Sequence, residues 1–306
     1  MKNNNTNHSE MRSFVLKLLL AIVIVIVADQ AIGVGLSYMR RHAGSGSAKD
    51  IEYTTHECKD DVLIFGSSRA MHHYVPSIIK DSLGLSCFNC GKDGMSIFYN
   101  YGRWQLSRKH HTPKVIIYDY SVFDHEISPA ENNRFQVELR PYCNDPDIRR
   151  LLKDTDPTEL VKNQSHLYRN NSKILQLVAG FLRREKLGDG YYPLKGEINH
   201  FYEIKIKKEV DSLKYQYLEK FIQDAQHDGI KVIFMTSPYY DGKNATCPQE
   251  IQALFKKHHV DFYDNEDLEG FTLNKKYFKN MQHLNQEGAA AYTKIVVGEI
   301  KKSLGQ

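Results

Sequence analysis

The chain has 306 residues, which is enough to bury an active site within one α/β core. Its 41 Lys and Arg residues stand against 37 Asp and Glu residues, so the formal net charge is only +4 and is spread along the chain. This balance leaves no basic face of the kind that binds nucleic acid, and we expect no nucleic-acid partner.

The N-terminal part of the chain carries one long apolar segment. After a polar tail, residues 1–13, the stretch 14–36 is mostly apolar, and Lys17 is its only charge before Asp29. A bilayer span takes about 20 apolar residues, and a lysine near one end can extend to the interface. A cleaved signal peptide starts in a similar way, but no small-x-small cleavage site follows here. The sequence therefore favours an uncleaved transmembrane anchor over residues 14–36.

Basic residues flank this segment on both sides, so their distribution gives no orientation. The short tail before the span and the large domain after it predict a single-pass anchor with the C-terminal domain outside the cytoplasm. Residues 37–60 begin with small and polar residues and are interpreted as a linker. Residues 61–306 then form the folded domain.

From residue 61 onward, short apolar runs alternate with helical patterns. The runs of strand length are residues 61–66, 85–91, 114–121, 231–238 and 260–264. The helical patterns are residues 77–83, 97–110, 210–228, 249–258 and 287–304. The third and fourth runs are β-branched and almost continuously apolar, which is typical of strands covered on both faces. The sequence predicts an α/β fold with a doubly wound, flavodoxin-like parallel sheet of about five strands.

The stretch from about 128 to 209 interrupts this alternation. It contains two helical patterns, residues 145–163 and 165–185, followed by a turn-rich stretch at 186–197. We interpret it as an insertion between the third and fourth strands. Such an insertion could cover the active site as a cap or pad one edge of the sheet.

Five cysteines give an odd count, which fits a disulfide framework poorly. Cys87 and Cys90 have C-x-x-C spacing, but they lie where a strand runs into a turn, without the helix start that activates a redox cysteine. Ordinary buried thiols are the favoured interpretation. A redox protein built on this pair is the rival, and no second C-x-x-C completes a zinc site.

Polar clusters follow the predicted strands, where doubly wound sheets bind their ligands. They read "GSSRA" after the first strand, "NCGKDG" after the second, "DYSVFDH" after the third and "NMQHLNQEG" before the last helix. Serine becomes a nucleophile only when a base takes its proton, and His283 is the best candidate for that base. Ser67 and Ser68 could instead cap the helix that follows. Arg69 could bind an anionic substrate group or pair with a surface carboxylate.

These clusters resemble the SGNH (GDSL-type) hydrolase superfamily. That resemblance places Ser68 on the nucleophile, His283 on the general base and Gly94 on the oxyanion-hole glycine, with the Ser68 N–H as a second donor. Ser67 takes the place of the family's usual aspartate. The resemblance covers residues 61–126 and 210–304 and implies chemistry that needs no metal or organic cofactor.

Two positions depart from the family pattern. Phe123 falls on the asparagine that supplies a further oxyanion donor. Asn280 falls on the acid of the D-x-x-H block, and in a serine protease triad the exchange of Asp for Asn lowers turnover about 10⁴-fold. Another carboxylate, Asp124 or Asp264, could replace the acid; otherwise a Ser-His dyad operates or activity is lost.

The sequence thus predicts a membrane-anchored serine esterase, acyl hydrolase or acyltransferase. Its expected substrate is a small ester or an O-acylated, for example O-acetylated, glycan of the cell envelope or an exported glycan. The expectation of a glycan follows from the anchor and from analogy. The alternative is a catalytically silent member of the same fold that acts as an envelope binding or scaffold protein.

Overall fold

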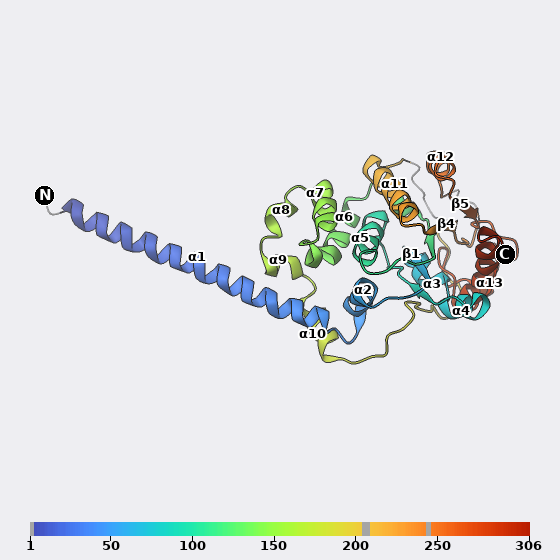
Figure 1. Cartoon of the computed structure of the whole chain (residues 1–306), viewed down its shortest axis with the longest axis horizontal. Coiled ribbons are helices and arrows are strands. Elements are labelled where there is room, and N and C mark those ends of the chain that lie inside the picture. The colour runs from blue at the N-terminus through green and yellow to red at the C-terminus, as the bar shows by residue number, and fades with distance from the viewer. Residues whose placement is uncertain (1–2, 204–208, 243–245) are drawn as a thin grey trace.

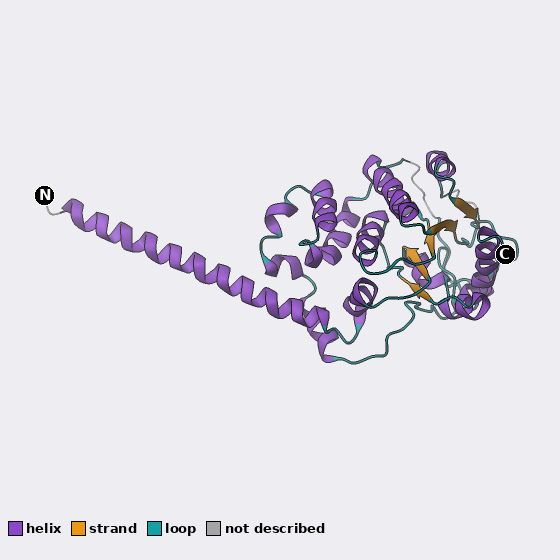
Figure 2. Cartoon of the chain, in the orientation of Figure 1, coloured by secondary structure: helices purple, strands orange, loops and turns teal. Residues whose placement is uncertain are grey.

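A parallel five-stranded sheet organises the domain, and helices cover both of its faces (Figures 1 and 2). The computed structural model describes residues 3–203, 209–242 and 246–306. The strands run in the order β2-β1-β3-β4-β5, and every neighbouring pair is parallel. Their bounds are β1 Val62–Gly66, β2 Cys87–Asn89, β3 Val115–Asp119, β4 Lys231–Thr236 and β5 Asp261–Asp264. The predicted doubly wound, flavodoxin-like α/β fold is confirmed.

The central strands are buried on both faces because their side chains alternate between two cores. Leu63 and Phe65 of β1 face one core, whereas Val62 and Ile64 face the other. The helices that follow the predicted patterns are α4 Pro76–Leu83, α5 Ile97–Ser107, α11 Ser212–His227, α12 Gln249–Lys257 and α13 Gln286–Ser303. Gly66 of β1 pairs with Asp119 of β3, so these two strands end together at one rim of the sheet.

The helix α3 Ser68–His73 begins directly after β1, as the expected helix after Ser67 and Ser68 should. The helix α2 Gly46–His56 was not predicted, and it lies within the segment interpreted as a linker. The linker interpretation of residues 37–60 is therefore wrong: Ile51 of α2 is buried, and Arg103 of α5 donates to the α2 carbonyl of Asp50 at 3.1 Å. Small polar residues suggested a flexible chain, but tertiary contacts make this segment part of the domain.

The N-terminal helix α1 Asn3–Arg41 extends away from the domain (Figure 1). Within the described residues, His8–Arg41 is long and apolar enough to cross a membrane by length and composition, as an anchor or a signal sequence would be. The apolar side chains from Phe14 to Val27 are exposed, as a membrane segment requires.

The C-terminal part of α1 contacts the insertion. One carboxylate oxygen of Asp29 accepts from Ser165 Oγ at 2.8 Å and from the Leu167 N–H at 2.9 Å, and the other accepts from the His166 N–H at 2.7 Å. The carboxylate therefore caps the first turn of the helix α9 His166–Asn170. The predicted span 14–36 thus includes residues that dock onto the domain.

The insertion folds into more helices than its pattern predicts. They are α6 Pro129–Leu139, η2 Arg140–Tyr142, α7 Pro146–Thr155, α8 Glu159–Lys162, α9 and α10 Ile174–Leu182. The two helices predicted over residues 145–163 and 165–185 are each divided in two. Asp156 precedes a proline and has an extended backbone, which ends α7, and Ser172 has a φ of 67° between α9 and α10.

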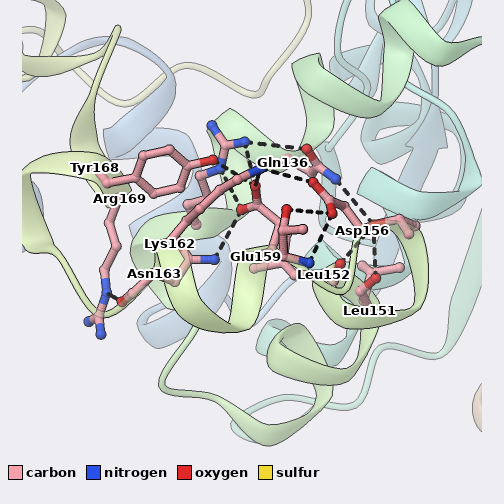
Figure 3. Close-up of polar contacts among 12 residues, drawn as sticks. Gln136, Leu151, Leu152, Asp156, Glu159, Lys162, Asn163, Tyr168 and Arg169 are labelled. Carbon is pink, nitrogen blue, oxygen red and sulfur yellow. Dashed lines mark hydrogen bonds and ion pairs between the residues drawn. The ribbon is translucent and has the colours of Figure 1, made fainter.

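A buried ion pair holds the insertion helices together (Figure 3). Arg140 donates to both carboxylate oxygens of Glu159, at 2.7 and 2.9 Å, and Tyr168 donates to the same carboxylate at 2.6 Å. Burial alone would raise the pKa of Glu159, but these hydrogen bonds hold that pKa below its ordinary value. The insertion is thus a packed subdomain.

The turn-rich end of the insertion crosses the rim where β1 and β2 end. The Asp189 carbonyl accepts from the Asn89 N–H at 2.8 Å, and the Tyr192 N–H donates to the Met71 carbonyl at 3.1 Å. Gly190 is required there because a Cβ would lie 1.9 Å from the Asn89 carbonyl oxygen.

All five cysteines are free and buried. Burial raises the pKa of the Cys90 thiol to about 11, and it raises the pKa of Cys87 as well. The interpretation of Cys87 and Cys90 as ordinary buried thiols is confirmed.

Candidate active site

The structure brings Ser68 and His283 into direct contact. Ser68 is the first residue of α3, at the carboxyl end of β1, and its Oγ lies 2.7 Å from Nε2 of His283. His283 lies in the loop before α13, where the side chain of Asn285 caps the helix by accepting from two backbone N–H groups. Both side chains are partly exposed, so a substrate can reach them.

Asn280 stands behind the imidazole and fixes its tautomer. The Asn280 side-chain oxygen accepts from the backbone N–H groups of Gln282 and His283, both at 2.9 Å. It also lies 3.1 Å from Nδ1 of His283. Because two backbone donors hold the oxygen in place, the amide cannot present its NH₂ to the ring, and Nδ1 must carry the proton. Nε2 is therefore free to accept the Ser68 proton.

This orientation removes the main defect that the exchange of Asp for Asn causes in a serine protease. There the amide selects the wrong tautomer of the histidine. In this chain Asn280 selects the right one, although it adds no negative charge to stabilise an imidazolium ion. The expected penalty is thus confined to electrostatics.

A second histidine positions the loop that carries His283. His73 is fully buried, and its Nε2 accepts from the Leu284 N–H at 3.0 Å. Its Nδ1–H then donates to Ser237 Oγ at 2.8 Å. Burial, together with the charge of Arg69, holds the pKa of His73 well below its ordinary value, so the ring stays neutral and keeps this acceptor.

The His283 imidazole is also uncharged at neutral pH. Burial, then the neighbouring charges of His72 and Arg69, lower the pKa of His283 to about 4, and Asp93 opposes them weakly. The His72 ring centroid lies 5.8 Å from that of His283, and His72 Nε2 lies 3.0 Å from an Asp93 oxygen. The neutral imidazole can accept a proton at Nε2, and the carboxylate of Asp93 favours its charged form.

Gly94, the predicted oxyanion glycine, lies in the loop after β2 with a φ of +65°. A Cβ at this position would lie 2.7 Å from Nη1 of Arg134, a residue of α6 in the insertion. Gly91 of the same loop approaches α3 closely, since its Cβ would lie 2.4 Å from the Met71 nitrogen. Glycine at 91 lets the loop of Gly94 pack against the helix that begins with Ser68.

Neither predicted substitute acid is bonded to His283. Asp124 accepts from Tyr118 OH at 2.6 Å and caps the short helix η1 Val122–Asp124, which also contains Phe123. Asp264 accepts from Thr236 Oγ1 at 2.6 Å at the end of β5. The side chain at the Nδ1 side of the imidazole is Asn280.

Arg69 pairs with a carboxylate, as one of its two predicted roles has it, but this carboxylate is buried and not on the surface. Its guanidinium is buried, lies 3.8 Å from Asp119 at the end of β3 and stacks 3.7 Å above the ring of Tyr239. It also donates to Ser237. Ser67 is buried as well, and its hydroxyl has no hydrogen-bond partner among the described residues. Both side chains are thus buried below the protein surface.

Sequence reasoning missed His72, His73, Asp93 and Arg134 as neighbours of the site. The two histidines follow Ser68 on the same helix, and that proximity was the one available signal. Asp93 directly precedes Gly94. Nothing in the sequence places Arg134 there, because it belongs to the insertion.

No protein-family model matches the chain, and no curated protein matches it either. Among solved structures, the chain is similar to a candidate acylhydrolase from Bacteroides fragilis at 13% identity and a TM-score of 0.41, over 85% of this chain and 97% of that one. It is similar to an acetyl xylan esterase at 13% identity and a TM-score of 0.39, over 78% and 99% of the two chains. An α/β hydrolase enzyme from the metagenome of Lake Arreo, Spain, gives 11% identity and a TM-score of 0.42, over 82% and 98%.

Proposed function

We propose that this chain is a serine esterase or acyl-transfer enzyme of the SGNH type that acts on O-acyl groups. The observation that carries the proposal is the 2.7 Å contact between Ser68 Oγ and His283 Nε2, with the Asn280 oxygen on the far nitrogen of the ring. A serine that only capped a helix would not need a base held on both sides.

The reaction starts when Ser68 Oγ attacks the ester carbonyl carbon and its proton passes to Nε2 of His283. The N–H groups of Ser68 and Gly94 bind the tetrahedral oxyanion. Collapse of that intermediate breaks the bond to the alcohol, which leaves with the proton from Nε2. Water or an acceptor hydroxyl then attacks the acyl-enzyme, with His283 as base, and Ser68 recovers its proton.

The proposed location and substrate follow from the apolar part of α1. A helix that can anchor the domain to a membrane favours a substrate at the cell envelope, such as an O-acylated glycan outside the cytoplasm. The glycan rests on this anchor and on analogy, and the chemistry of the site does not depend on it.

The test measures hydrolysis of 4-nitrophenyl acetate by the full chain in detergent. Replacing the nucleophile in Ser68→Ala, or the base in His283→Gln, should lower kcat/KM by about 10³-fold or more. Ser67→Ala is the matched control, since it removes the neighbouring hydroxyl, which has no partner among the described residues. We expect Ser67→Ala to keep most of the activity.

A catalytically silent binding or scaffold protein is the second candidate, because Asn280 adds no negative charge to the site. Turnover by the wild-type chain that Ser68→Ala leaves unchanged would favour this candidate and end the proposal of an esterase. Adding an alcohol acceptor to the assay separates the two chemistries, since a transferase forms a new ester and a hydrolase releases the acid.

A further inference from the structure

A cavity of about 490 Å³ lies between α3, the loop after β2 and the insertion. Met71, which lies one turn after Ser68 on α3, forms part of its wall. Asp93 and Met95, on either side of Gly94, form another part. Gly94, one of the proposed oxyanion donors, therefore lies between two residues that line this cavity.

The remaining wall comes from the insertion, apart from Lys92 of the loop after β2, and carries the charged residues Arg134, Glu138 and Lys173. Lys173 lies 2.6 Å from a Glu138 carboxylate oxygen, and Lys92 lies 3.4 Å from the same oxygen. The Asp93 carboxylate is bonded to His72. Arg134 is exposed on this wall and forms no ion pair within the described part of the chain, so its guanidinium is available to a ligand.

We propose that this cavity binds the alcohol portion of the substrate and that Arg134 recognises an anionic group, a carboxylate or a phosphate, on it. The inference rests on the proposed esterase function and adds the substrate class. The position of the guanidinium supports it, because Nη1 lies 2.7 Å from the place of a Cβ on Gly94. An anion held by Arg134 would keep the ester carbonyl close to Ser68.

Two features of the cavity suit such a ligand. A guanidinium binds a carboxylate or a phosphate through two parallel hydrogen bonds, which fixes the orientation as well as the position of the anion. The side chains of Met71, Met95 and Val137 supply apolar surface for the carbon skeleton next to the charged group. A neutral ester would fill the apolar part and leave the guanidinium unused.

The test compares three acetyl esters with the full chain in detergent. They are 4-acetoxybenzoate, 4-acetoxyphenyl phosphate and the neutral methyl 4-acetoxybenzoate. We expect the wild-type kcat/KM for at least one anionic ester to exceed that for the neutral one by about tenfold or more. Arg134→Gln should lower this preference by about tenfold, whereas Arg150→Gln, an exposed arginine of α7, should keep it. The carboxylate and phosphate esters identify which anion is preferred.

A preference for anionic esters that survives Arg134→Gln would overturn the inference, as would its absence in the wild type. A failure of the proposed function looks different. In that case no ester turns over, and calorimetry with 4-hydroxybenzoate or phenyl phosphate measures anion binding to the cavity directly. Binding to Ser68→Ala that Arg134→Gln abolishes in the double variant would support the anion site, and no binding to Ser68→Ala would reject it.

Discussion

Replacing Asn280 with aspartate tests the role of His283 most directly. The new carboxylate would stand where the amide oxygen is now, about 3 Å from Nδ1. The backbone N–H groups of Gln282 and His283 would hold it ionised, because hydrogen bonds to the charged form favour that form. The amide already fixes the tautomer, so this substitution adds charge and changes little else.

The size of the effect follows from Coulomb's law. Two unit charges about 4 Å apart interact by about 4 kcal/mol at an effective dielectric constant of about 20. Burial of the new charge offsets part of this interaction energy. Since one pKa unit corresponds to about 1.4 kcal/mol, we expect the pKa of His283 to rise by roughly one to two units. The imidazolium forms in the transition state, so kcat for 4-nitrophenyl acetate should rise about 10- to 100-fold.

The pH profile gives an independent reading. Only the neutral imidazole can act as base, so activity is lost as the pH falls through the pKa of His283, which is about 4 in the wild type. The acidic limb of kcat/KM should therefore lie near pH 4, with a plateau above it, and should move upward in Asn280→Asp. Asn280→Ala, which loses the tautomer lock, should fall below the wild type at every pH. If Asn280→Asp neither raised kcat nor moved the limb, His283 would not be the base.

Three further variants test the supports of the site and of the anchor. His73→Ala should destabilise the chain by about 2–4 kcal/mol and lower kcat/KM, because the Leu284 N–H loses its buried acceptor; a full kcat/KM in this variant would show that the loop needs no such support. Gly91→Ala should lower the melting temperature, with a loss of about 1–3 kcal/mol, because its Cβ would meet the Met71 nitrogen; an unchanged melting temperature would refute this packing. Asp29→Ala should raise hydrogen exchange in the first turn of α9, at a loss of about 0.5–2 kcal/mol, whereas Asp29→Asn should keep more protection; equal exchange in both variants would contradict the capping role.

Much of the fold could be predicted because its signals are local. Each strand is an apolar run whose length and β-branched composition identify it without its neighbours, and the alternation with helices implies parallel pairing. The order β2-β1-β3-β4-β5 is the one that the predicted flavodoxin-like fold implies. Local composition failed for residues 37–60, where α2 is stabilised by packing against α5 and not by its own pattern.

Local pattern also singled out Ser68 and His283, one at a strand end and the other before the last helix. What the sequence could not determine is the effect of Asn280, since an amide can present either an oxygen or an NH₂ to the ring. Folding decides this, because the backbone N–H groups of the same loop donate to the amide oxygen and cannot bond to its NH₂. Asn280 in place of an aspartate predicted a large loss of activity from the sequence alone. With the amide held in this orientation, the expected loss is smaller.

The sequence by itself therefore determined the class of fold, the apolar helix, and the serine and histidine that meet at the rim. Tertiary structure alone decided that His73 supports the loop of His283, a contact between Leu284 and a residue 211 positions earlier. It also decided that Arg134 of the insertion reaches Gly94 and that Asp29 of α1 caps α9. Periodicity and composition describe a residue's immediate neighbours along the chain, whereas these contacts join segments that only the packing of the whole domain brings together.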